Sequence, residues 1–78
     1  MEYIDVTPIR EAVEKALANG YTLSEICRRM GWEENRVFAE TSRLRRVIGA
    51  ENKDKTISVK NAELIADALN LSYNEIGL

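Results

Sequence analysis

The sequence predicts an all-α fold, a compact bundle of about five short helices. Three observations support this prediction: apolar residues recur at helical spacing, helix start and stop signals punctuate the chain, and 78 residues suffice for one domain, 1–78. A domain of this size needs a compact core with mostly local contacts, which helices provide. The helices are expected at about residues 8–19, 23–30, 34–48, 58–69 and 73–77.

The first helix is marked at both ends. Thr7 is expected as its N-cap, Pro8 as its first helical residue and Gly20 as its stop. One apolar stripe faces the core and consists of Ile9, Val13, Ala16 and Leu17. The preceding segment 1–6 is expected either to form a brief strand or to pack against the bundle.

The stretch 22–31, TLSEICRRMG, is the most informative part of the chain. Thr22 followed by Glu25 forms a capping box, and Gly31 ends the short helix. An arginine-rich helical segment follows directly. A short capped helix, a glycine turn and a basic helix together predict a helix-turn-helix that binds DNA.

Two interpretations of 34–48 remain open, because this segment lacks a good N-cap. Either one helix covers it, or irregular chain precedes a shorter helix that begins near Glu40 or Thr41. In both, Val37 or Thr41 forms an inward stripe with Leu44 and Ile48. Gly49 ends the helix, and 50–56 is expected as a polar loop.

The last two helices also have start signals. Ser58 opens one, Asn70 is its expected left-handed end residue, and Ser72 with Glu75 forms a second capping box. The C-terminal apolar residues are expected either to close the core or to form a dimer seam; they are Tyr73, Ile76 and Leu78.

Charge is unevenly distributed along the chain. The net charge is −2, but residues 28–60 hold nine Lys/Arg against five acids, whereas 1–27 and 61–78 each sum to −3. A basic middle between acidic ends is typical of oriented binding to a polyanion, and ordinary solvated surface is the alternative.

Composition argues against several function classes. The single cysteine, Cys27, and the lack of histidine exclude a disulfide framework, the usual zinc sites and a Cys-His nucleophile. Cys27 is therefore expected to pack between helices, and Trp32 to fill the gap after the turn rather than stack on DNA. We expect no enzyme activity, cofactor, metal or small-molecule substrate, and a soluble intracellular protein with no leader or membrane span.

The segments TLSEICRRMGW, TSRLRRVIG and ISVKNAELIADALNLSYNEIGL resemble the Cro/repressor-type helix-turn-helix family, the lambda-repressor-like DNA-binding fold. The resemblance covers residues 8–78 and is closest in character to small regulators of actinobacterial phages. It implies a transcriptional regulator in the cytoplasm of the bacterial host, which places the second helix of the motif in the major groove, often as a homodimer on a palindromic operator.

One position departs from the pattern of this family. Apolar residues are expected at fixed distances after the turn glycine; Val37 fits, whereas the next position falls on Glu40. Aligning TSRLRR instead puts Leu44 in that slot and implies about four extra residues after Trp32.

The residues expected to touch DNA lie mostly in 34–48. As one helix with ~100° per residue, this segment brings Asn35, Ala39, Ser42 and Arg46 together, with Arg43 at the margin. Arginine pairs with guanine and asparagine with adenine, so the predicted base-reading residues are Asn35, Ser42, Arg43 and Arg46. The alternative is a solvated face paired with Glu33 and Glu40.

Contacts to the DNA backbone are expected from residues that offer a hydroxyl or a cation: Thr22, Arg28, Arg36, Thr41, Arg45, Lys53 and Lys55. Thr22 has a capping role compatible with this one, Thr41 is either a cap or a phosphate donor, and Arg28 is also placed to complement the helix dipole.

Two functions from different classes follow. The first is a sequence-specific, double-stranded DNA-binding regulator, a small Cro-like repressor. The second is a protein-interaction module on the same scaffold, such as an antitoxin or adaptor, because a fold does not settle a function. The salt dependence of binding to duplex DNA distinguishes them.

Overall fold

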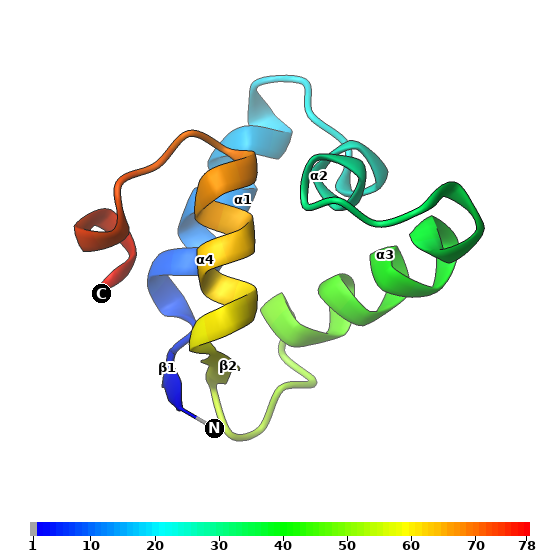
Figure 1. The fold of residues 1–78 in the computed structure, drawn as a ribbon. Helices are drawn as coiled ribbons and strands as arrows, with labels where there is room; N and C mark the ends of the chain where they lie inside the picture. Colours follow the sequence, from blue (N-terminus) through cyan, green and yellow to red (C-terminus); the bar gives the residue numbers. More distant parts are fainter. Residues whose placement is uncertain (1) are drawn as a thin grey trace.

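A computed structural model describes residues 2–78 (Figure 1). These residues form β1 (Tyr3–Asp5), α1 (Thr7–Ala18), α2 (Leu23–Arg29), α3 (Glu34–Ile48), β2 (Thr56–Ser58), α4 (Val59–Ala68) and the 3-10 helix η1 (Tyr73–Ile76). The Cα radius of gyration is 11.5 Å, as expected for one compact domain of this length. The helices lie close to their predicted bounds, and the last is a 3-10 rather than an α-helix.

The fold is not purely helical, so the all-α prediction was wrong in this respect. β1 and β2 pair in antiparallel fashion, with Tyr3 opposite Ser58 and Ile4 opposite Ile57. One further backbone hydrogen bond lies at each end of this ladder. The Val6 amide donates to the Lys55 carbonyl, and the Val59 amide donates to the Glu2 carbonyl. The two strands are far apart in the sequence, and helical periodicity gives no information on such pairing. The sheet places the N-terminal segment beside the start of α4 (Figure 1).

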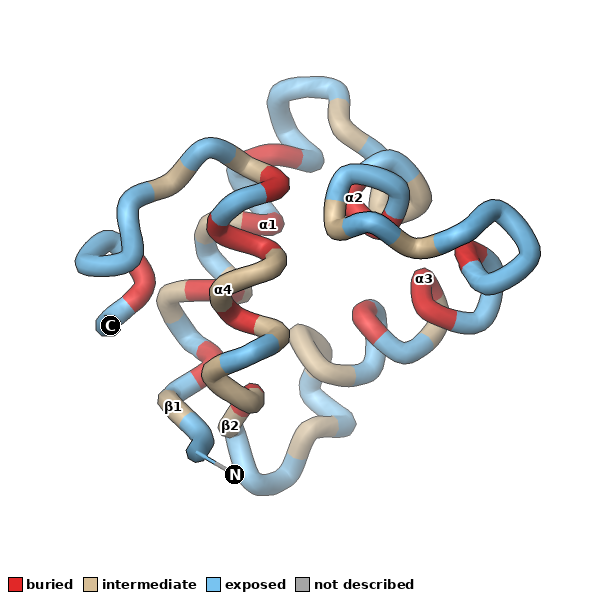
Figure 2. Tube along the Cα trace, in the orientation of Figure 1, coloured by how far each residue is buried: buried red, intermediate tan, exposed pale blue. Residues whose placement is uncertain are grey.

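One apolar cluster holds the helices together, and Figure 2 shows the buried stretches of α1 and α4 close together. Its fully buried large side chains come from different elements: Ile9, Ile26, Ile65, Ile76, Val6, Val13 and Cys27. Leu17 is 37% exposed, against the prediction, because it lies past the edge of the stripe that Ile9, Val13 and Ala16 fill. Within residues 2–78, no helix is both long and apolar enough to cross a bilayer.

The predicted caps of the later helices are present, but among residues 2–78 the Thr22–Glu25 capping box shows only its first bond, to the Thr22 hydroxyl. The Thr22 hydroxyl accepts a hydrogen bond from the Glu25 amide at 3.1 Å, and η1 has the full capping box of Ser72 and Glu75. Asn70 has φ 57°, the left-handed conformation predicted for it. These signals act within a few residues, so they operate wherever the helix packs.

The start of α1 differs from the prediction. Thr7 is the first helical residue rather than the N-cap, and Val6 takes the cap position without a capping side chain. The Asp5 carboxylate accepts a hydrogen bond from the Thr7 amide at 2.7 Å instead. This bond to the charged form lowers the pKa of Asp5. The Asp5 carboxylate therefore satisfies one of the free amides at the start of α1, a task that the prediction gave to the Thr7 hydroxyl.

Candidate nucleic-acid interface

The turn between α2 and α3 has the geometry of a Schellman motif. Gly31 has φ +99°, and its amide donates to the Arg28 carbonyl at 3.0 Å. The next amide, of Trp32, donates to the Cys27 carbonyl at 3.3 Å. This pair of bonds satisfies the last carbonyls of α2 and turns the chain sharply. In Figure 1, α2 is seen nearly end-on and α3 side-on, so the two helices cross.

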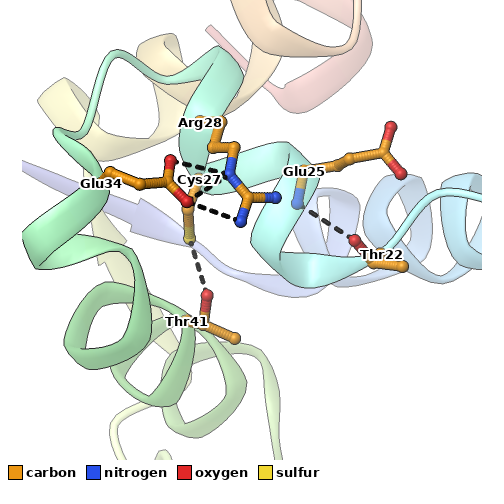
Figure 3. Close-up of polar contacts among 6 residues, drawn as sticks. All are labelled: Thr22, Glu25, Cys27, Arg28, Glu34 and Thr41. Atoms are coloured by element: carbon orange, nitrogen blue, oxygen red, sulfur yellow. Dashed lines mark hydrogen bonds and ion pairs between the residues drawn. The ribbon is translucent and has the colours of Figure 1, made fainter.

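An ion pair fastens the start of α3 to the end of α2 (Figure 3). The Arg28 guanidinium donates from Nε and Nη2 to the Glu34 carboxylate, with the two shortest N–O distances both 2.9 Å. The bonds with Arg28 lower the pKa of Glu34, and those with Glu34 raise the pKa of Arg28. Both side chains are exposed, so the pair orients the turn more than it stabilises the fold. Arg28, a predicted phosphate contact, thus has a carboxylate partner within the protein's own surface.

Thr41 is not a helix cap and is too buried for the predicted phosphate contact; it takes the inward position that was its other expected place. It lies within α3, is 8% exposed, and its hydroxyl donates to the Cys27 sulfur at 3.6 Å (Figure 3). Cys27 is buried in the core, where desolvation raises the pKa of its thiol. The two residues form the polar part of the seam between α2 and α3, in keeping with the packing role expected of Cys27.

Glu40 is the unexpected member of the buried face of α3. It is 5% exposed, its Oε2 accepts from Arg36 Nη2 at 3.2 Å, and its Oε1 lies 3.9 Å from Arg43 Nε. α3 is one continuous helix, and Glu40 lies on its inner side together with Val37 and Leu44. The charged residue occupies the place where an apolar one was expected, and two arginines compensate its charge.

The two arginines bound to Glu40 lie on the flank of α3. The Arg36 guanidinium also stacks over the Trp32 ring, 5.5 Å from its centroid, and Trp32 packs against the core. Arg43 borders a cavity of about 250 Å³ between α2, α3 and α4, whose lining includes Met30 and Leu64. Arg43, predicted to read bases from the margin of the outward face, is thus exposed and also lies near the Glu40 carboxylate.

The outward face of α3 gathers the remaining predicted residues. Asn35, Ala39 and Arg46 are exposed and Ser42 is half-buried, on the side opposite Val37 and the other buried positions. Within residues 2–78, neither Arg45 nor Arg46 has a salt bridge. The end of α3 thus presents two exposed cations that this part of the chain does not neutralise.

Two contacts that sequence reasoning missed hold the far end of α3. Arg10 of α1 donates from Nε to the Ile48 carbonyl, and Asn52 Nδ2 donates to the carbonyls of Val47 and Thr56 at 2.8 Å each. The Arg10 contact has no local signal, because it joins distant segments. An asparagine in a polar loop is a turn signal, but its partners emerge only in the fold.

The other predicted backbone contacts come from separate elements. Lys53 and Lys55 are exposed in the loop after α3, whereas Thr22 lies at the start of α2. The structure thus places Asn35, Ser42 and Arg46 on one face, with Arg43 at one margin, as predicted, and Arg45 at the other. Arg36 is paired with Glu40 beside this face, and Thr41 lies on the buried side of α3.

Phe38 is a surface residue of α3 that the sequence reasoning did not single out. Its side chain is 87% exposed, more than the other exposed large apolar residues of the described chain. A helical wheel of 34–48 places it on the same side as Ser42 and Arg45. The helical period of 34–48 alone would therefore have identified Phe38 as a surface residue.

Comparison of the chain with models of protein families, with curated proteins and with solved structures found no match. The case for a function therefore depends on the geometry of α2, the turn and α3.

Proposed function

We propose that this protein is a sequence-specific regulator of transcription of the Cro/repressor type, which binds double-stranded DNA. In this proposal α2, the turn and α3 are a helix-turn-helix, and α3 lies in the major groove. The observation that carries the proposal is the outward face of α3, where Arg45 and Arg46 have no salt bridge within residues 2–78. The resemblance to small phage regulators, stated from the sequence, points the same way.

Each side chain of this face has a physical role in the proposed complex. Ala39 and Ser42 are small and let the helix backbone approach base edges. Arg46 is suited to a bidentate contact with guanine, and Asn35 to one with adenine. Arg45 lies beside them at the edge of the face, where phosphates flank the groove.

Contacts outside α3 would position the helix along the duplex. The exposed loop lysines, Lys53 and Lys55, follow its C-terminal end, where they can neutralise phosphates. The N-terminus of α2 at Thr22 offers backbone amides to another phosphate. The Arg28–Glu34 pair keeps the two helices in register, so that both sets of contacts can form together.

The test is a selection of binding sequences from random duplexes, followed by a footprint of the enriched one. We expect an enriched sequence whose affinity falls with salt, with a log–log slope of about −0.9 for each phosphate contacted. A scrambled duplex of the same composition is the control and should bind more weakly. A two-fold symmetric winner would indicate a homodimer.

An absence of enrichment, or binding that does not respond to salt, would contradict the proposal. The competing function, a protein-interaction module on the same scaffold, predicts that result.

A further inference from the structure

Phe38 is placed where the core cannot explain it. It is 87% exposed although its neighbour along α3, Val37, is 4% exposed and belongs to the core. An isolated apolar residue on a surface needs no explanation. Phe38 differs from such a residue because it shares the surface of α3 with Arg45 and Arg46, which have no salt bridge in the part of the chain that the structure describes.

Its neighbours on the helix define that setting. Phe38, Ser42 and Arg45 follow one another at i, i+4 and i+7, which places them on a single ridge of α3. Ser42 is half-buried and Arg45 exposed, and Arg46 lies on the next ridge with Ala39. The ridge thus has an aromatic ring in the N-terminal half of α3 and the Arg45 cation at its C-terminal end, with Arg46 beside it.

The occupant of such a ridge needs two properties at once. It must carry negative charge that meets Arg45 and Arg46, and it must offer an apolar group to the Phe38 ring about two turns along the helix. The major groove of DNA admits an α-helix and is lined by phosphates, and among the four bases only thymine presents a methyl group there. Charge complementarity therefore favours duplex DNA over an apolar protein surface.

We propose that Phe38 contacts the 5-methyl group of thymine in the major groove, so that the preferred site has thymine under the N-terminal half of α3. This inference rests on the proposed function and adds a specificity-determining residue to it. Because a methyl contact involves no hydrogen bond, Phe38 distinguishes thymine from a base that lacks only that methyl group.

The experiment uses the selected duplex, with each thymine replaced in turn by deoxyuridine, and the full-length chain. Deoxyuridine removes the methyl group and leaves every hydrogen-bonding atom in place. At one thymine, we expect wild-type affinity to fall about fourfold, the equivalent of ~0.8 kcal/mol for a buried methyl-sized group. The Phe38→Ala variant should bind the parent duplex more weakly and bind the thymine and deoxyuridine duplexes equally.

Tyr3→Ala is the matched control. Tyr3 is an exposed aromatic residue at 60%, but it lies on β1, away from α3, so this variant should show the wild-type response to deoxyuridine (Figure 1). Because Phe38 makes little contact with the core, Phe38→Ala should keep the wild-type unfolding midpoint.

Three results would overturn the inference. One is a wild-type protein that binds the duplex in a salt-dependent manner but is indifferent to every deoxyuridine, which leaves the proposed function intact. Another is a Phe38→Ala variant that keeps the methyl discrimination and loses self-association in sedimentation, which would assign Phe38 to a contact between two copies. A selection that enriches no sequence would remove the proposed function together with this inference.

Discussion

Two pairs of adjacent arginines occupy the same local position, the last turn of a helix, yet have different surroundings. In α2, Arg28 binds the carboxylate of Glu34, and Arg29 stacks over the Tyr21 ring at 4.8 Å. Arg29 Nη1 also reaches the Ala68 carbonyl at 3.5 Å, which links α2 to the end of α4. This pair therefore contributes to the fold.

The second pair, Arg45 and Arg46, closes α3. Both are exposed, and within residues 2–78 neither has a salt bridge. Each pair complements the dipole of its own helix equally well. The difference between the pairs therefore comes from what packs nearby, and it separates cations that orient the fold from cations available to a ligand.

The largest expected effect on DNA affinity comes from replacing one arginine pair at a time with alanine. The double variant R45A/R46A should lose specific DNA affinity, by ~1–3 kcal/mol for a base-reading arginine, with only the small fall in unfolding midpoint that follows from losing the helix-dipole interaction. R28A/R29A removes the same charge and should reverse the pattern, with a lowered unfolding midpoint and a smaller loss of affinity. Fluorescence anisotropy and thermal unfolding measure the two properties. Equal losses of DNA affinity in both variants would contradict the different roles assigned to the arginine pairs of α2 and α3.

A second variant would free Arg36 and Arg43 from their ion pairs with Glu40. Glu40→Leu replaces a buried carboxylate with an apolar side chain of similar volume. The fold should tolerate this change, because Arg36 and Arg43 are exposed and no buried charge is left without a partner. Arg36 and Arg43 then lose their partner. We expect tighter binding to nonspecific duplex and a salt slope steeper by about one per arginine that gains a phosphate.

Glu51→Leu is the control for this charge change. It also removes one negative charge, but Glu51 is exposed in the loop after α3. If Glu51→Leu strengthens binding as much as Glu40→Leu, net charge rather than release of the arginines is responsible.

The smallest effect concerns the ion pair across the turn. The Arg28 guanidinium lowers the pKa of Glu34 below its ordinary value of 4.5, which an NMR titration of the carboxyl should show. Since the folded-state pKa is the lower one, this stabilisation is present above pH 4.5 and is lost as pH falls through the folded pKa. Arg28→Gln should return the pKa toward 4.5, whereas Arg29→Gln should leave it lowered. An unchanged pKa in Arg28→Gln would exclude Arg28 as the cause.

Sequence reasoning predicted the helices and most of their ends, because caps and glycine stops act over four residues or fewer. The bounds of α3 match the single-helix interpretation, and its outward face was located from the helical period alone. Thr7 failed as a cap because a competing acceptor, Asp5, lies beyond the local pattern that was considered.

The sequence by itself determined where helices begin and end and which side of α3 faces outward, since both depend on the spacing of neighbours along the chain. Only the tertiary structure decided that β1 pairs with β2, that Glu40 is buried, and that, among residues 2–78, Arg45 and Arg46 lack the partners that Arg28 and Arg29 have. The physical reason is that hydrogen bonds, ion pairs and burial join residues that are close in space, and closeness between distant segments is set by the packing of the whole core.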